Sequence, residues 1–405
     1  MALVTELELP EFDYLDPTLR GERFHERMRE LRSQGWLAKS PLGCFVLDRD
    51  GVDFFLKSKQ LKFPGALVVE LFGVTEGPLH EEVLKNILCI DGADHRRLRS
   101  LVNPSLTARS VERFRPAIRS FIEELFSKFA SSGRCEFIAD VAKPYPALTI
   151  ATVMGAPLSD AERLYDWSNW IQKQFAQDVL EQREQIEQAV LEFYEYAHGL
   201  LDERRKNPGD DLMSLLIAAE EDGDRLSDDE LVNLVLNILV GGVDTTQSQL
   251  AHAMRLFAEH PDQWQLLAGD PEQYAERAVW EVVRYEPITP FTARIALEDI
   301  EYRGVTFPRN TIVMVSAFDA NRDPETWDGP DEFDITAERD AKPHTFGAGI
   351  HYCLGANLAR LEMTEALTFL SQNMRDLRLD GEPVFGSVNG IYGLDELPLA
   401  FTPAA

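Results

Sequence analysis

Apolar residues recur every three or four positions through most of this 405-residue chain, and that periodicity constrains its fold more than any other feature. Strand-like alternation is confined to 36–47, 293–316 and 377–401. We therefore predict a mainly α fold with a minor β subdomain. The helical pattern is clearest over 21–34, 94–103, 107–131, 160–207, 227–260, 271–285 and 354–372.

No linker rich in Gly and Ser, or in Pro, divides the chain, so a single domain over 1–405 is expected despite its length. The segment 320–343 is rich in Asp, Pro and charged residues and has no sustained period. This composition predicts an ordered meander and not a helix.

The charge balance is strongly acidic, with 40 Lys and Arg against 69 Asp and Glu, a formal net charge of −29. Such a charge argues against non-specific attraction to nucleic acid or to anionic membrane. The first ten residues lack the basic and apolar regions of a signal peptide, and no uninterrupted apolar run reaches the roughly 18 residues of a membrane span. We expect a cytoplasmic protein without nucleic-acid or membrane partners.

One of four widely spaced cysteines, Cys353, follows a glycine-rich stretch, Phe346-Gly-Ala-Gly-Ile-His-Tyr-Cys-Leu-Gly, and precedes a helical run. Glycines at 347 and 349 let the main chain approach a flat ligand. At a helix start, unpaired N–H groups and the helix dipole favour a thiolate, which is a strong electron donor to iron. A lone cysteine after a glycine turn is also compatible with a buried, inert thiol.

A second feature is the glycine pair Gly241-Gly242 within the apolar helix predicted over 227–260. Each helix-interior glycine costs roughly 0.8–1 kcal/mol relative to alanine, so the pair needs a reason. Close helix packing is one reason; room for a ligand against the helix is another. Thr245 lies four residues after Gly241, so its hydroxyl can bond back to that carbonyl and open a local groove.

Together these two stretches resemble the signatures of the cytochromes P450: Phe-Gly-x-Gly-x-His-x-Cys-x-Gly, and Gly-Gly-x-Asp-Thr-Thr in the distal helix. The resemblance implies that Cys353 is the axial ligand of a haem b iron, that Phe346 packs near the proximal haem face and that His351 pairs with a haem propionate. It further implies that Gly241 makes room for haem and that Asp244 and Thr245 form an acid–alcohol pair that delivers protons.

Glu281 and Arg284 lie one helical turn apart among apolar neighbours, so both are expected to be buried. They match the family's Glu-x-x-Arg, for which the resemblance implies Arg339 as the third member. The family's propionate clamp matches His95 and Arg99, spaced i, i+4. Arg294 matches a further propionate arginine on the strand after the Glu-x-x-Arg helix.

The resemblance spans most of the chain and implies the cytochrome P450 fold and a haem-thiolate monooxygenase. Such an enzyme inserts one oxygen atom from O2 into a small, largely apolar organic substrate. No flavin or iron–sulfur motif occurs in the sequence, so the electrons are expected from NAD(P)H through an external iron–sulfur ferredoxin and its reductase. Two alternatives are a member that uses peroxide, dehydrates or reduces, and a haem protein that senses gas or transfers electrons.

The substrate pocket and the docking site for the ferredoxin are further expectations. Arginines outnumber acids over 94–119, and Arg109 and Arg113 are the rim positions where a small acidic ferredoxin would dock. Segment 66–86 is expected to roof the pocket. By motif register, the residues facing the substrate are Asn237, Val240, Ile288, Thr289, Phe291, Val388 and Asn389.

Overall fold

The computed structural model describes residues 2–176, 178–221 and 226–404, which pack as two compact units. Unit 1 contains the chain up to Pro64, then Arg277–Cys353 and Pro383–Asp395. Unit 2 contains Gly65–Glu276, Leu354–Glu382 and the chain from Glu396 onward. Because each unit is assembled from separate stretches, no single linker divides the two in the sequence.

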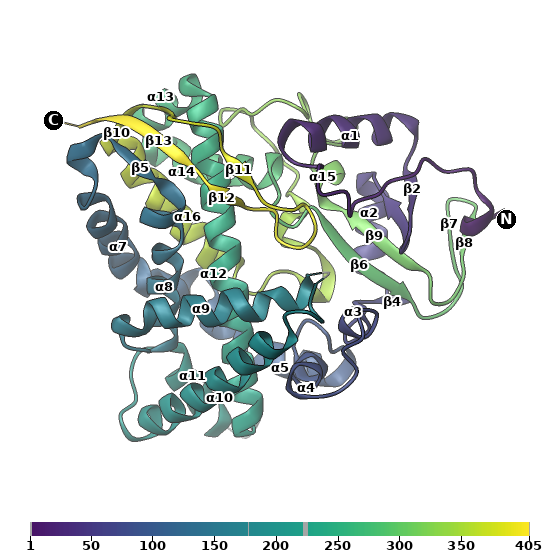
Figure 1. Ribbon diagram of the computed structural model, residues 1–405, viewed down its shortest axis with the longest axis horizontal. Coiled ribbons are helices and arrows are strands. Elements are labelled where there is room, and N and C mark those ends of the chain that lie inside the picture. Colours follow the sequence, from purple (N-terminus) through teal and green to yellow (C-terminus); the bar gives the residue numbers. More distant parts are fainter. Residues whose placement is uncertain (1, 177, 222–225, 405) are drawn as a thin grey trace. The chain divides into compact units, whose positions relative to one another are not determined.

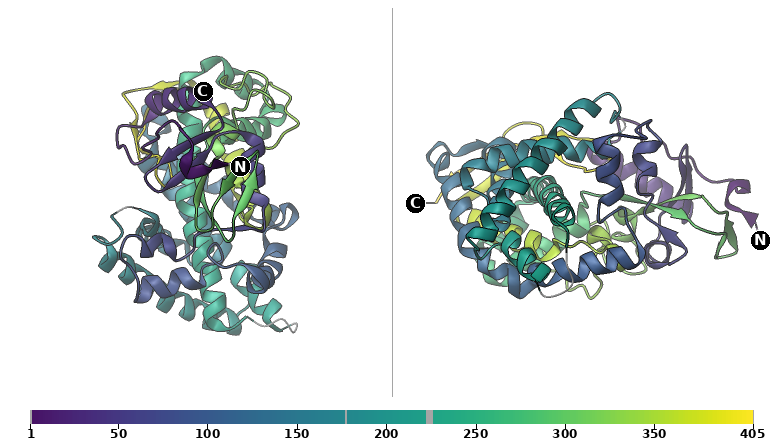
Figure 2. Two further views of the ribbon diagram at one scale, coloured as in Figure 1. Left: turned by 90° about the vertical axis from the view of Figure 1, so that its right-hand side faces the viewer. Right: turned by 90° about the horizontal axis from the view of Figure 1, so that it is seen from below.

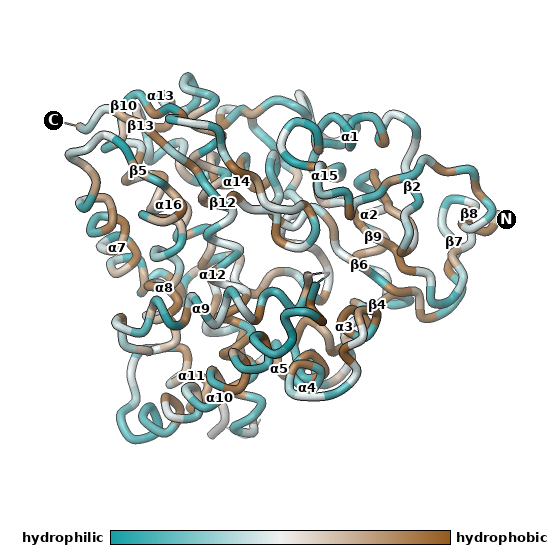
Figure 3. Tube along the Cα trace, in the orientation of Figure 1, coloured by the Kyte–Doolittle hydropathy of each residue, from teal (hydrophilic) through white to brown (hydrophobic). Residues whose placement is uncertain are grey.

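Unit 1 is built on a five-stranded mixed sheet in the order β2-β3-β9-β6-β4 (Figure 1). The hairpin β2–β3 is antiparallel, β3 runs parallel to β9, and β6 pairs antiparallel with β9 and with β4. In Figure 3 strand β9 is mostly hydrophobic, whereas helix α1 is mostly hydrophilic. The strand bounds are β2 Leu37–Ser40, β3 Gly43–Val46, β4 Leu61–Lys62, β6 Phe291–Ala296 and β9 Ile312–Ser316.

The helices of unit 1 bury a narrow apolar stripe against this sheet. Helix α1 (Gly21–Gln34) buries Phe24, Met28 and Leu31, spaced i, i+4 and i+7. Smaller elements complete the unit: α2 Arg49–Lys57, the second half of α14 (Pro271–Tyr285), α15 Ala317–Ala320, the strands β1 Ala2–Leu3, β7 Ile300–Tyr302 and β8 Val305–Phe307, and the pair β11 Val384–Phe385 with β12 Leu394–Glu396.

Unit 2 is mainly helical and is organised around α12 (Asp228–Glu259). A capping box of Ser227 and Glu230 begins this helix, as Ser at the N-cap and Glu three residues later predict. The right-hand view of Figure 2 looks nearly along α12, with other helices of unit 2 around it. The longer of these helices are α4 Pro78–Lys85, α5 Gly92–Val102, α7 Arg115–Ser127, α8 Pro144–Met154, α9 Ala161–Gln172, α10 Arg183–Lys206, α11 Leu212–Glu221, α13 Pro261–Gly269 and α16 Ala356–Asn373. Unit 2 also contains the short helices α3 Leu67–Glu70 and α6 Ala108–Val111. Its three-stranded sheet has the order β10 Met374–Leu379, β13 Pro398–Pro403, β5 Arg134–Glu136.

The predicted mainly α fold with a minor β part is confirmed, and most helix bounds agree with the periodicity to within two residues. Several elements differ from the prediction: the stretch 107–131 is divided into α6 and α7, and the helices α2, α4, α8, α11 and α13 were not predicted. The stretch 160–207 is not one helix but two, α9 and α10. Helix α8 was not predicted because it is buried on nearly every side, so its sequence lacks the polar face that produces a helical period of hydrophobicity. Within the described residues, no helix is long and apolar enough to cross a membrane.

Candidate active site

The glycine-rich loop of unit 1 holds Cys353 at an accessible position. Gly349 has a φ of +69°, and a Cβ there would lie 3.0 Å from the carbonyl oxygen of Leu56, so glycine is needed for both conformation and space. The loop closes when the backbone N–H of Cys353 donates to the carbonyl of Phe346 at 2.8 Å. Cys353 itself is exposed.

The other three cysteines have different surroundings. Burial raises the pKa of the Cys44, Cys89 and Cys135 thiols to about 12, with nearby carboxylates adding to the shift at Cys89 and Cys135. These thiols stay protonated at neutral pH and are poor metal ligands or nucleophiles. Cys353 is therefore the cysteine of this chain whose environment suits ligand chemistry.

Within unit 1, contacts with α14 and with the meander hold the cysteine loop in place. The Phe346 ring meets Trp280 edge-to-face, with centroids 6.0 Å apart. Thr345 donates to the Val283 carbonyl, and the buried Asn321 amide donates to Thr345 Oγ1 at 2.9 Å while accepting from the His344 N–H at 2.7 Å. The support that Asn321 provides for this loop was not predicted, because asparagine in a meander usually marks a turn.

Glu281 and Arg284 of α14 form a buried ion pair that is fully satisfied. Arg284 donates to both carboxylate oxygens of Glu281 at 2.8 and 2.7 Å, and Arg339 donates to the same oxygens at 3.0 and 3.2 Å. The remaining donors of Arg284 reach backbone carbonyls of the meander, those of Asn321, Pro330 and Glu332. Such pairing offsets the desolvation of buried charges, so this cluster holds the meander on α14.

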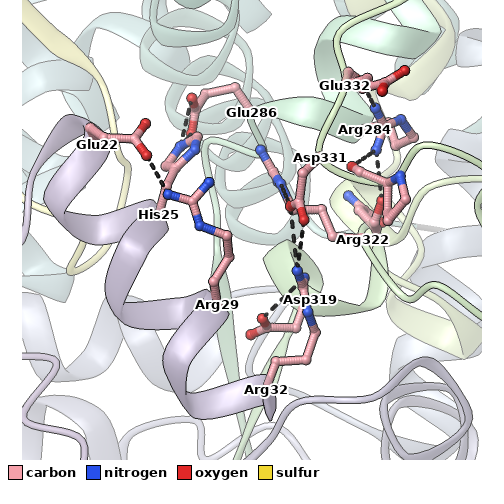
Figure 4. A network of polar contacts seen from close by, with 12 residues as sticks. Glu22, His25, Arg29, Arg32, Arg284, Glu286, Asp319, Arg322, Asp331 and Glu332 are labelled. Atoms are coloured by element: carbon pink, nitrogen blue, oxygen red, sulfur yellow. Dashed lines mark hydrogen bonds and ion pairs between the residues drawn. The ribbon is translucent and has the colours of Figure 1, made fainter.

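A second charged network, shown in Figure 4, links α1 to the same region of unit 1. Arg32 contacts Asp331 at 3.2 Å and the fully buried Asp319 at 3.7 Å, and Arg322 contacts Asp331 at 3.5 Å. Burial raises the pKa of Asp319 to about 7 and lowers that of Arg322 to about 10. The sequence did not predict this network, because charged residues on an amphipathic helix such as α1 ordinarily face solvent.

The remaining predicted residues of unit 1 divide into two groups. Arg294 on β6 is buried, and its guanidinium donates to the Ala293 carbonyl at 2.8 Å. Phe291 and Val388 belong to an apolar core, and the Phe291 ring packs against four aromatic rings, those of Phe12, Tyr14, Phe24 and Phe45. Their side chains are thus part of the unit's packing. Ile288 is also buried, whereas Thr289, Asn389 and His351 are half-buried.

In unit 2, Thr245 and Gly241 of α12 adopt the arrangement that their spacing predicts. The Thr245 hydroxyl donates to the Gly241 carbonyl at 2.6 Å. Gly241 is exposed although its neighbours Val240 and Val243 are buried, and a Cβ at Gly241 would meet nothing within 4 Å. The neighbouring glycine has a different role, since a Cβ at Gly242 would lie 2.5 Å from the Ile150 side chain of α8. Gly241 leaves open space and Gly242 allows helix packing.

Asp244, one residue before Thr245, is a buried acid facing α9. Burial raises its pKa to about 7, and a hydrogen bond with the Ser168 side chain only partly opposes the shift. Among the described residues, its Oδ2 has no hydrogen-bond partner. A carboxyl group that titrates near neutral pH can both accept and release a proton under working conditions.

Other polar groups of unit 2 lie near the predicted site residues. On α5, His95 is buried and Arg99 half-buried, one helical turn apart as predicted. On α16, Glu362 is fully buried, and burial holds its pKa well above the usual range despite hydrogen bonds with the Thr149 and Thr246 side chains. The sequence did not single out Glu362, because it lies in a regular amphipathic helix where glutamate is common.

The pocket residue Asn237 is half-buried on α12 and belongs to a hydrogen-bonded chain. Its amide nitrogen donates to the carbonyl and the side-chain oxygen of Asn233, at 2.7 and 3.1 Å. The Asn233 amide in turn donates to Glu82 of α4 at 2.6 Å. Segment 66–86, the expected roof, is therefore tied to α12 by polar contacts as well as by packing.

Comparison with known proteins agrees with this geometry. The cytochrome P450 family model matches residues 149–267 and 273–377. Luteothin monooxygenase of Streptomyces thioluteus is 37% identical over 98% of this chain and 97% of its own length, and nocardicin C N-oxygenase of Nocardia uniformis subsp. tsuyamanensis is 38% identical over 74% of each. The crystal structure of CalO2 superposes with a TM-score of 0.90 at 29% identity, covering 98% of this chain and 100% of that one.

A haem iron and dioxygen chemistry define this class of protein, and the chain belongs to the cytochrome P450 family. It is an oxidoreductase of the monooxygenase type. The residues present fit a haem: Cys353 is an exposed sulfur donor on a glycine-shaped loop, and Gly241 leaves room where a side chain would otherwise stand.

Proposed function

We propose that this cytochrome P450 inserts one oxygen atom from O2 into a small, largely apolar organic molecule, with Cys353 as the axial ligand of haem b. The observation that carries the proposal is the Asp244–Thr245 pair beside Gly241: a buried acid with a pKa of about 7 next to a hydroxyl bonded to the helix backbone. When bound, haem supplies the redox chemistry that activates dioxygen. The protein's task is to hold the haem, admit the substrate and deliver protons.

Side chains that complement the charge and shape of haem would hold it in place. The Cys353 thiolate would bind the iron, and Phe346 would pack on the proximal side. A haem carries two propionate carboxylates, which His95, Arg99, Arg294 and His351 would neutralise through charge-assisted hydrogen bonds.

Proton delivery falls to the acid–alcohol pair. Cleaving the O–O bond heterolytically requires two protons, and a buried site must import them through its own side chains. Asp244 would release a proton from its raised-pKa carboxyl and regain one from solvent. Thr245, whose hydroxyl hydrogen is committed to Gly241, keeps its oxygen as an acceptor that can order a water near the reacting oxygen.

The substrate is proposed to contact four apolar side chains, two amides and one hydroxyl: Val240, Ile288, Phe291, Val388, Asn237, Asn389 and Thr289. The relatives include a luteothin monooxygenase and a nocardicin C N-oxygenase, so similarity at this level does not fix one substrate. A titration of the haem spectrum with a chemically diverse panel should give high-spin shifts with neutral hydrophobic compounds. A preference for small polyanions would overturn this substrate class.

Product analysis separates the proposed reaction from its rivals. With NADH, a ferredoxin, its reductase and a compound that gives a high-spin shift, we expect a product carrying one oxygen atom from isotopically labelled O2. A product without that label, or one that forms only with peroxide, would contradict the proposal. A gas sensor or electron carrier would give no product.

The electron donor is proposed to be a small acidic iron–sulfur ferredoxin that docks near the arginines of 94–119. Most of these arginines already pair within unit 2: Arg97 with Glu230, Arg113 with Asp210, and Arg115 and Arg119 with Glu365. Arg113 also stacks on Phe114, so its replacement would disturb the fold. Arg109 is exposed and is the better rim position.

The variant Arg109→Glu is expected to slow haem reduction by the ferredoxin about two- to tenfold at low salt, because charge at a rim mainly sets the association rate. Stopped-flow measurement of haem reduction at increasing ionic strength tests this prediction. The reduction rate of the wild type should fall with added salt, because the Debye length is only about 8 Å at 0.15 M salt. Arg375→Glu, at an exposed arginine of β10, is the matched control. Salt-independent reduction with a silent Arg109→Glu would move the docking site elsewhere.

A further inference from the structure

Glu82 occupies a position in α4 where an apolar residue would be expected. The buried face of this helix carries Leu79, Glu82 and Val83, followed by Asn86 one turn later. Leu79 and Val83 pack with Ile186 of α10 in an apolar cluster. A carboxyl group at such a position is costly relative to an apolar side chain of similar size, so its presence points to a role in specificity.

The Glu82 carboxyl is the end point of a directed chain of hydrogen bonds. Its Oε2 accepts from the Tyr194 hydroxyl of α10 at 2.7 Å and from the Asn233 amide of α12 at 2.6 Å. Because the Asn233 nitrogen points toward Glu82, its side-chain oxygen is left to accept from the amide nitrogen of Asn237 at 3.1 Å. That nitrogen also donates to the Asn233 backbone carbonyl at 2.7 Å, so the backbone and the Asn233 side chain together orient the Asn237 amide. Each amide thus donates toward Glu82, and the Asn237 side chain is left with its oxygen as an acceptor.

The direction of this chain does not depend on the charge of Glu82. Burial raises the pKa of Glu82 to about 7, against opposing hydrogen bonds from Tyr194 and Asn233, so neutral and ionised forms coexist near neutral pH. In both forms Oε2 is an acceptor, because a proton would reside on the other oxygen.

The position of α4 itself is fixed by a second attachment. Gly77, just before the helix, has a φ of +93°, and a Cβ there would lie 2.5 Å from the Arg183 guanidinium. Arg183 of α10 donates to the Glu76 carbonyl at 2.6 Å. With its N-terminal end held in this way, α4 presents Glu82 to α12 in one orientation.

We propose that Glu82 is a specificity-determining positioning residue: through Asn233 it orients the Asn237 carboxamide so that its oxygen faces the substrate, and the enzyme thereby selects substrates with a hydroxyl or N–H donor at that point. The inference rests on the proposed function, in which Asn237 contacts the substrate. It specifies that the substrate carries a hydrogen-bond donor opposite Asn237, which the types of pocket residues alone do not indicate.

The test uses matched probes that differ in one hydrogen-bond donor, 4-phenylphenol and its methyl ether, 4-methoxybiphenyl, titrated into the haem-loaded enzyme and followed by the spin-state shift. The wild type should bind the phenol about three- to tenfold more tightly, the range expected of one neutral hydrogen bond. Glu82→Leu should lower that ratio at least about twofold, because only the backbone carbonyl of Asn233 would then orient Asn237, whereas Glu82→Gln, which keeps an acceptor, should retain the ratio. A wild type that binds both probes alike, or a ratio unchanged in Glu82→Leu, would overturn the proposal.

Two further variants separate orientation from general loosening. Tyr194→Phe removes a hydroxyl that donates to Glu82 and accepts from the Asn233 amide at 3.0 Å, but it leaves the direct hydrogen bond from Asn233 to Glu82 in place, so the ratio should persist even if both probes bind more weakly. Glu81→Gln, at the exposed neighbouring carboxylate, should leave binding unchanged. If Glu82→Leu does not fold, Asn233→Ala removes the same side-chain link and should equally lower the ratio, although the backbone carbonyl at position 233 still accepts from Asn237. The reduced carbon monoxide spectrum of each variant reports haem–thiolate ligation independently, so failure of this inference is distinct from failure of the proposed function.

Discussion

Replacing Cys353 with histidine is expected to abolish completely the strongly red-shifted Soret band of the reduced carbon monoxide complex. That band requires a thiolate donor to the iron, and a neutral imidazole donates far less electron density. Cys353 is the exposed cysteine, on a loop shaped by Gly349 and closed by its own hydrogen bond to Phe346. Absorption difference spectroscopy of the reduced protein with and without carbon monoxide measures the effect.

The matched control is Cys89→Ala, which removes a thiol whose raised pKa keeps it protonated. This variant should keep the red-shifted band at full intensity. The histidine variant should still take up haem, because the other contacts to haem are untouched. Survival of the band in Cys353→His would assign the axial ligand to another residue.

The second large effect is expected at the acid–alcohol pair. Thr245→Ala should continue to consume NADH but divert most of it to peroxide, because the hydroxyl that orders the proton-donating water is lost. Asp244→Asn should slow turnover on the order of a hundredfold, the lower range of general acid catalysis, with little change in substrate affinity. NADH consumption, peroxide and product are measured together, and Thr245→Ser, which retains the hydroxyl, should stay coupled.

The pH dependence gives the Asp244 assignment a separate signature. With a pKa of about 7, the carboxyl is mostly protonated below that pH and can donate, whereas above it the ionised form predominates. Turnover of the wild type should therefore fall as pH rises through about 7, and the pH profile of Asp244→Asn should lack this fall. Wild-type rate and coupling in both variants would place the relay on other residues.

Local chemistry in the sequence was sufficient to predict some parts of this protein and not others. The Thr245–Gly241 bond follows from helical spacing alone, and the contact between Arg339 and Glu281 was expected from the order of motifs; both are present. The Asn233 link to Glu82 joins residues 151 positions apart, and no local pattern encodes such pairing. The aromatic rings around Phe291 come from distant stretches of the chain for the same reason, and its register on the strand does not reveal them.

The interleaving of the two units has a consequence for the order of events during translation. The Tyr392 hydroxyl accepts a hydrogen bond from the backbone of Gly21, 371 residues earlier, and its ring lies in the same core as Phe12, Phe24 and Phe45. On a ribosome, these N-terminal aromatic residues emerge roughly 20 to 75 seconds before the segment that completes their core, at about 5–20 residues per second. Unit 2 has its helices from α3 to α13 available much sooner. The N-terminal part of unit 1 is thus the region of the nascent chain with the longest need for protection, and a chaperone that binds exposed aromatic segments would find its sites there.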